Sequence, residues 1–219
     1  MTDIVARLEA SLDLPELPDA ARKNARELFE SLSRPVIVAV LGPPGSGKSA
    51  LINLFLKDRL LPDALSANVI EIVPAEDFAA EVSYADGRLE AAERDELSDV
   101  QDADHVHIAA PNAVLRDMVL IEASACGSKV GLKDAISYAS ERADIILWCT
   151  QTFDDSEKSL WKDIDPQKKD HGFLLLTKAD KMARKRKLAQ ALAALTGVAQ
   201  EDFSGLLPIA TLQALKALD

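Results

Sequence analysis

The chain has 219 residues, of which 48% are hydrophobic, and its formal net charge is −11. This length suits one α/β domain, or one domain with a small extension, and the apolar fraction is enough for a sizeable core. Such an acidic chain is a poor general binder of nucleic acid or anionic lipid. It has no apolar run of about 18 residues and no N-terminal signal pattern, and its two cysteines, Cys126 and Cys149, fit a reducing cytoplasm, where we expect the protein.

Two short amphipathic helices are predicted at the beginning of the chain. Apolar residues recur at helical spacing over 3–12 and 20–33, and two prolines between these stretches interrupt the helix. Asp19 is a candidate N-cap for the second helix. We therefore predict a helical extension over 1–34, followed by the main domain over 35–219.

A strand, a glycine-rich loop and a helix are predicted in direct succession. The β-branched run Val36–Leu41 predicts a buried parallel strand, and Ala50–Leu56 is rich in good helix formers. Between them, Gly42–Ser49 fits the P-loop pattern G-x-x-x-x-G-K-[ST] in full. Backbone N–H groups at a helix N-terminus point at an anion, and the helix dipole adds to the attraction. The stretch therefore predicts a nucleotide phosphate site.

The positions of this loop have separate expected roles. Glycines allow unusual backbone dihedrals and a close approach to the phosphates. Lys48 is expected to reach the β- and γ-phosphates, and the Ser49 hydroxyl to ligate Mg²⁺. Pro43 and Pro44 donate no N–H, but they lie early in the loop and leave the later amides available. The predicted phosphate-binding residues are Gly42, Gly45, Ser46, Gly47, Lys48 and Ser49.

The remaining chain alternates between strand and helix patterns. Strands are predicted at 69–73, 79–84, 106–109, 118–121, 144–149, 173–176 and 206–210, and helices at 89–104, 133–141, 154–164, 181–195 and 211–218. The acidic stretch 89–104 is expected to be a solvated surface helix. The alternation predicts an α/β fold with a mostly parallel central sheet and helices on both faces.

A second motif indicates which base is bound. Thr177–Asp180 directly follows a buried strand and fits [NT]-K-x-D. The Asp180 carboxylate can accept hydrogen bonds from guanine N1–H and the 2-amino group. Adenine offers neither donor, so it would leave the carboxylate buried and unpaired, which is costly. The stem of Lys178 can lie along the base, and the motif, including Thr177, predicts GTP or GDP as the ligand.

These motifs together resemble the dynamin-like family of large GTPases, including its bacterial members, over nearly the whole chain beyond residue 35. The similar stretches are 47–62 (GKSALINLFL, then LLP), Tyr84–Arg88, Pro111–Ile121 and Thr177–Asp180. The resemblance implies an α/β fold of the P-loop GTPase type. It also implies a backbone contact to the base at Ala210, where the family's fifth motif is expected, and a homodimer across the nucleotide face.

The chain departs from the family at the motifs that serve hydrolysis. The family's D-x-P-G is Glu122-Ala123-Ser124-Ala125 here, so a longer Glu122 stands where the Mg²⁺-orienting Asp is expected. Ala125 replaces the Gly whose N–H senses the γ-phosphate. At the switch threonine, only Ser66 offers a hydroxyl within 66–68. The resemblance thus implies Lys48 and Ser66 as catalytic groups, and Ser49 and Glu122 as Mg²⁺ ligands.

These losses favour a guanine-nucleotide-binding domain whose GTP hydrolysis is slow or lost, because phosphoryl transfer depends on positioning and electrostatics. Two alternatives stay open. Glu122 ends an apolar strand and could be the Walker-B-type carboxylate of an ATPase, although an ATPase has no use for Thr177–Asp180. Alternatively, the domain could be a non-catalytic scaffold or dimerisation module. The family's helical stalk and lipid-contacting segment are not expected within these 219 residues, so this chain alone gives no support for membrane contact.

Overall fold

The computed structural model describes residues 2–14, 16–124 and 129–217 of the chain. The chain divides into two compact units, 1–35 and 36–219. Within the described ranges, no helix is both long enough and apolar enough to cross a membrane. Ala125 and Cys126, which the sequence analysis named, lie outside the described residues.

The first unit is a pair of helices, α1 (Thr2–Leu12) and α2 (Asp19–Ser33), as predicted. The Arg22 guanidinium closes the connection between them by donating to the carbonyl oxygens of Leu14 at 2.8 Å and Leu17 at 3.2 Å. The predicted N-cap was wrong, because Asp19 is already the first helical residue. Pro18 occupies the cap position, and no side chain caps this helix.

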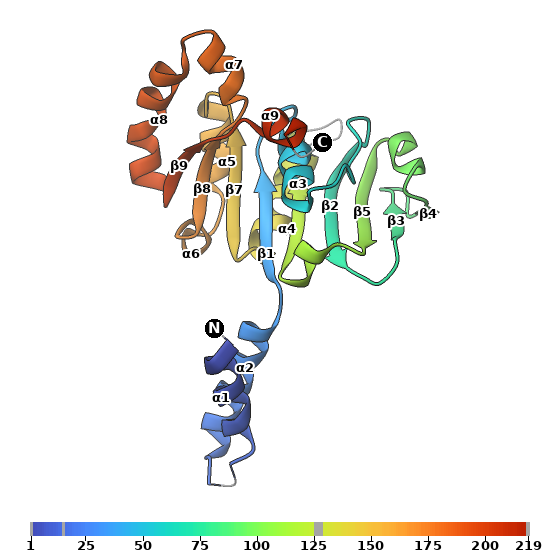
Figure 1. The fold of residues 1–219 in the computed structure, drawn as a ribbon, viewed down its shortest axis with the longest axis vertical. Coiled ribbons are helices and arrows are strands. Elements are labelled where there is room, and N and C mark those ends of the chain that lie inside the picture. The colour runs from blue at the N-terminus through green and yellow to red at the C-terminus, as the bar shows by residue number, and fades with distance from the viewer. Residues whose placement is uncertain (1, 15, 125–128, 218–219) are drawn as a thin grey trace. The chain divides into compact units, whose positions relative to one another are not determined.

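The strands of the second unit form one sheet in the order β4-β3-β5-β2-β6-β1-β7-β8-β9 (Figure 1). Their bounds are β1 Val36–Leu41, β2 Ala67–Pro74, β3 Ala79–Ser83, β4 Leu89–Ala92, β5 Ala103–Ala110, β6 Met118–Ala123, β7 Ile145–Thr150, β8 Gly172–Leu176 and β9 Gly205–Pro208. The part β6-β1-β7-β8-β9 is parallel throughout. β2 runs antiparallel to β6, and β3 runs antiparallel to both β4 and β5. β2 and β5 pair parallel to each other, so the extension at this side of the sheet is mixed, and the predicted mostly parallel sheet is confirmed.

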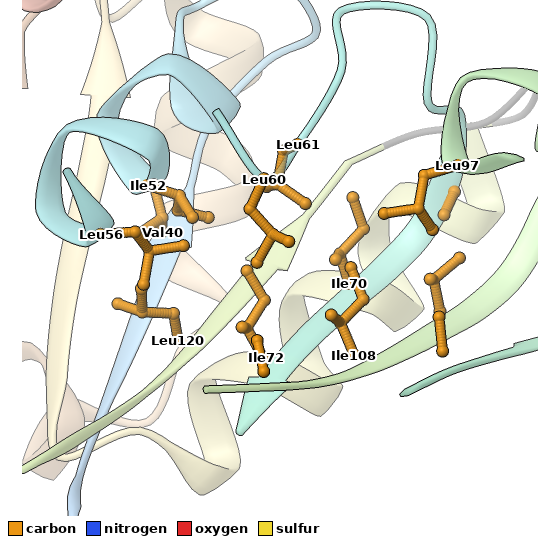
Figure 2. Close-up of a cluster of buried hydrophobic side chains, with 14 of the residues drawn as sticks. Val40, Ile52, Leu56, Leu60, Leu61, Ile70, Ile72, Leu97, Ile108 and Leu120 are labelled. Atoms are coloured by element: carbon orange, nitrogen blue, oxygen red, sulfur yellow. The ribbon is translucent and has the colours of Figure 1, made fainter. Parts of the chain in front are cut away.

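Helices cover the sheet on two faces (Figure 1). Their bounds are α3 Lys48–Leu56, α4 Lys129–Arg142, α5 Asp155–Lys162, α6 Pro166–Lys169, α7 Ala179–Arg184, α8 Leu188–Asp202 and α9 Thr211–Lys216, with short 3₁₀ helices η1 Glu96–Asp99 and η2 Ala113–Arg116. Because strand side chains alternate between faces, Val40 joins one core with Ile52 of α3, while Leu41 joins another with Ala139 of α4. Figure 2 shows the first of these cores. Both faces of β1 are therefore buried, as a central parallel strand requires.

The predicted surface helix over 89–104 was wrong. The turn after Tyr84 has Gly87 at φ +86°, and the Tyr84 N–H donates to the Arg88 carbonyl at 3.0 Å. The chain therefore returns as β4, antiparallel to β3, and only Glu96–Asp99 is helical, as η1. Leu97 in η1 is fully buried in the first core (Figure 2). Strand pairing and the burial of Leu97 outweigh the helix-prone acidic composition.

The predicted basic helix over 181–195 is divided into α7 and α8. The break lies at Arg186, whose φ is +55°. Two hydrogen bonds close the end of α7, from the Arg186 N–H to the Ala183 carbonyl and from the Lys187 N–H to the Met182 carbonyl, both at 2.9 Å. This pattern is typical of a helix that ends with a left-handed residue. The loop places a cluster of basic side chains between two helices rather than along one.

Candidate nucleotide-binding site

The glycine-rich loop leaves β1 and enters α3 in a conformation that needs its glycines. Gly42, Gly45 and Gly47 have φ values of +132°, +70° and +98°. A Cβ at Gly42 would lie only 2.1 Å from the carbonyl oxygen of Cys149 on β7. Position 42 therefore requires glycine for two reasons, its positive φ and the lack of room for a side chain. At Gly45 only the φ favours glycine, because nothing lies within 4 Å of the place that its Cβ would take.

Lys48 lies beneath this loop and is almost completely buried. Its Nζ donates to the carbonyl oxygens of Gly42 and Pro43, both at 3.1 Å. Burial lowers the pKa of the Lys48 ammonium, and the attraction of Glu122 opposes this shift. The ammonium is thus held at the floor of the loop, where an incoming phosphate oxygen could replace a carbonyl as its partner.

Ser49 and Glu122 meet beside the loop. The Ser49 hydroxyl donates to Glu122 Oε1 at 3.0 Å, and the Ser124 hydroxyl donates to the same oxygen at 3.1 Å. Burial raises the pKa of the Glu122 carboxyl, while Lys48 and the two hydroxyls lower it. The second oxygen, Oε2, is buried and has no hydrogen-bond partner among the described residues.

This pair fits the Mg²⁺ ion that the fold implies. Mg²⁺ prefers oxygen ligands, and a hydroxyl with one carboxylate is a suitable set beside substrate phosphates. The Ser49 proton faces Glu122, which leaves its lone pairs for a cation, and the orphaned Glu122 Oε2 is a further acceptor. Ser49 and Glu122 are therefore the residues that would hold the ion.

Lys178 connects the second motif to the glycine-rich loop. It has φ +55°, and its Nζ donates to the Gly45 carbonyl at 2.6 Å. Thr177, one residue earlier, is buried, and its hydroxyl donates to the Thr150 carbonyl at 3.1 Å. Asp180 is largely buried, with its side chain 13% exposed, and its carboxylate forms an ion pair with Arg184 on the same helix at 3.8 Å.

The segment before α9 is tied to the second motif through the backbone. The Ala179 N–H donates to the Ile209 carbonyl at 3.0 Å, and the Ile209 N–H donates to the Leu176 carbonyl at 2.8 Å. This places Ala210, the N-cap of α9, beside the residues expected to read the base.

A pocket of about 370 Å³ opens over the loop. The predicted site residues that line it are Gly45, Gly47, Lys48, Ser49, Ser66, Glu122 and Lys178. Ser66 stands just before β2, where its N–H donates to the Val100 carbonyl and its own carbonyl accepts from Ala103, both at 3.1 Å. The pocket is also lined by Asp63, Ser124 and Thr211, which were not predicted as site residues although each lies within a few residues of a recognised motif.

Five predicted residues do not line the pocket: Gly42, Ser46, Thr177, Asp180 and Ala210. Ser46 is the clearest case, because its side chain is buried and its hydroxyl has no partner among the described residues. The Ser46 N–H donates to the Pro43 carbonyl at 3.2 Å. The Ser46 side chain therefore does not line the pocket, and its N–H already has a partner within the loop.

No protein-family model and no curated protein matches this sequence. Among solved structures, the chain is similar to two structures of an oligomerised bacterial dynamin pair, which is described as a mechanism for the long-range sensing and tethering of membranes. The TM-scores are 0.58 and 0.57, and the sequence identity is 18% in each case. The chain has the fold of a dynamin-type GTPase domain. The two matches cover 98% and 99% of this chain but only 39% and 40% of the matched dynamin chains.

Proposed function

We propose that this chain binds a guanine nucleotide with Mg²⁺ in the pocket above the P-loop. The observation that carries the proposal is the joining of two motifs far apart in sequence, through the Lys178 Nζ donating to the Gly45 carbonyl at 2.6 Å. A phosphate-binding loop and a base-reading segment thus meet at one pocket. Lys48 and the amides of the loop would bind the phosphates, and Ser49 with Glu122 would hold the cation.

Asp180 supplies the proposed base selectivity. Its side chain is largely buried, and Arg184 stands 3.8 Å away on an exposed side chain. A guanine base can offer two N–H donors to this carboxylate, whereas adenine offers none in that position. A buried carboxylate left without donors is costly, so adenine nucleotides should bind more weakly.

We further propose that GTP hydrolysis is slow or lost. Pro44 lines the pocket, and a proline has no N–H to offer to a phosphate oxygen. The longer Glu122 contacts Ser49 directly at 3.0 Å. Ser66 is the only hydroxyl within 66–68, and its backbone is fixed on both sides. Each of these differences affects the positioning on which phosphoryl transfer depends.

Calorimetric titration with GDP, GTP and ATP in Mg²⁺ tests the binding, and phosphate release tests the turnover. Asp180→Asn should weaken GDP binding at least about tenfold, because an amide replaces one of the acceptors facing guanine. Asp155→Asn is the matched control, since that side chain is 99% exposed. The lack of any guanine nucleotide affinity would refute the binding proposal, and rapid GTP turnover would refute the slow-hydrolysis part.

We also propose that the chain forms a homodimer across the nucleotide face. The resemblance to dynamin-like proteins and the oligomerised state named for the two similar structures support this assignment. Sedimentation with and without GDP and aluminium fluoride tests it. A sedimentation coefficient that stays that of a monomer in both conditions would contradict it.

A further inference from the structure

Glu157 on α5 is a buried carboxylate that the proposed site does not use. It is 3% exposed. Its Oε2 accepts from Trp148 Nε1 at 2.8 Å, and its Oε1 accepts from the Thr150 hydroxyl at 2.9 Å. Burying a carboxylate is costly unless donors satisfy it, so these contacts fix both partners firmly.

Thr150, the last residue of β7, also holds the turn that follows the strand. Because its hydroxyl proton is given to Glu157, its oxygen is left to accept from backbone donors. It accepts from the Phe153 N–H at 2.8 Å and from the Thr152 N–H at 3.1 Å. Phe153 has φ +48°, a conformation that non-glycine residues adopt only when their surroundings impose it.

The carbonyl of the same residue contacts the predicted base-reading motif. The Thr150 carbonyl accepts from the Thr177 N–H at 2.9 Å and from the Thr177 hydroxyl at 3.1 Å. Thr177 is 1% exposed, and its Cβ lies 4.0 Å from the place that a Cβ on Gly47 would take. A continuous buried path therefore runs from Glu157 through Thr150 to the first residue of the motif and to the wall of the P-loop.

We propose that Thr150 and Glu157 are positioning residues that set the selectivity of the site for guanine over adenine. They act by fixing Thr177, and through it Asp180, relative to the P-loop. This inference rests on the proposed guanine nucleotide binding. The P-loop itself supplies the phosphate contacts, so losing the path should reduce base selectivity while phosphate binding is retained.

Thr150→Val tests the proposal, because valine keeps the shape of threonine and removes the hydroxyl. Affinities for GDP, ADP and pyrophosphate are measured by calorimetry on the full chain with Mg²⁺. The preference for GDP over ADP should fall by about tenfold or more, equivalent to one lost hydrogen-bonded contact, while the pyrophosphate affinity stays within about twofold. Thr150→Ser restores the hydroxyl and should restore the preference.

Leu195→Ala is the stability control, because Leu195 is buried in the core cluster that contains Trp148 and, as an apolar side chain, takes no part in the hydrogen bonds of the path. Its preference for GDP should equal that of the unmodified chain. If Thr150→Val does not fold, Thr177→Val removes the hydroxyl contact to the Thr150 carbonyl and should reduce the preference in the same way.

Three outcomes would overturn the inference: an unchanged preference in a folded Thr150→Val or Thr177→Val chain, an equal fall in Leu195→Ala, or a parallel loss of pyrophosphate binding. A failure of the proposed function is distinguishable from these, because the unmodified chain would then show no preference for GDP over ADP.

Discussion

The Nζ of Lys178 lies 2.6 Å from the carbonyl oxygen of Gly45, although the two residues are far apart in sequence. The contact joins the predicted base-reading motif to the P-loop. Both residues also line the same pocket, so a nucleotide in that pocket would lie beside both of them.

Replacing Lys178 with methionine should therefore weaken GDP binding about tenfold, because the stem is kept while a charged hydrogen bond is lost. The melting temperature should change little, since the bond is exposed. Calorimetry and thermal unfolding measure the two effects. Lys181→Met, on the exposed side of α7, is the control and should bind GDP normally. Equal affinities for the two variants would contradict the assigned role.

Gly42→Ala should destabilise the domain by at least about 2 kcal/mol, because a clash with backbone adds to an unfavourable dihedral angle. The new Cβ would lie 2.1 Å from the Cys149 carbonyl oxygen, at φ +132°. Gly197→Ala, in the helix α8, is the opposite case, since nothing lies within 4 Å of its Cβ. It should stabilise by up to about 1 kcal/mol. Urea unfolding of both variants measures the difference, and equal effects would refute the explanation.

Leu97→Ala should cost about 2–5 kcal/mol, because the side chain is completely buried in η1. Leu89, a short distance earlier on β4, is 65% exposed, and Leu89→Ala should change stability by less than about 0.5 kcal/mol. The comparison separates a segment anchored in the core from a solvated helix, in which both leucines would matter little. Chemical denaturation provides both values.

Glu122→Gln should change how stability depends on pH in the nucleotide-free protein. Burial raises the pKa of this carboxyl above its usual 4.5, so above that pH the unfolded chain loses a proton that the folded chain still holds. The stability of the unmodified protein should then fall as the pH rises, by up to about 1.4 kcal/mol per pH unit until the folded-state pKa is passed.

Glutamine does not titrate, so the melting temperature of Glu122→Gln relative to the unmodified chain should rise between pH 4.5 and pH 7. Thermal unfolding at several pH values in this window measures it. Glu201→Gln, at an exposed position near the end of α8, is the control and should show a constant difference. A constant difference for Glu122→Gln as well would mean that burial of the carboxylate has no net cost here.

The parallel half of the fold and the P-loop could be predicted because their signals are local. Val36–Leu41 is a buried strand in both the prediction and the structure, and a P-loop glycine pattern admits few backbone paths. The region 89–104 could not be predicted in the same way. The conformation of this segment depends on the pairing of β4 with β3 and on the packing of Leu97 in the core, and both involve residues outside the segment.

In the site as well, only those positions that a local sequence pattern fixes could be predicted. The positions of Lys48 and Ser49 follow from the loop, and their contacts agree with the roles expected of them, which remain predictions. The burial of the Ser46 hydroxyl and the path from Glu157 to Thr177 depend on side chains that meet only after folding. A sequence pattern has no signal for such contacts.

The pairing of β1 also bears on synthesis of the chain. β1 lies between β6 and β7, so Val36 pairs with Met118 and Val38 pairs with Ile145, both far downstream. During translation, the P-loop leaves the ribosome well before either supporting strand exists. Closing such long loops is slow, and unpaired apolar strands are prone to aggregate. The P-loop is thus among the first parts of this unit to be made, and the strands that flank β1 follow only much later.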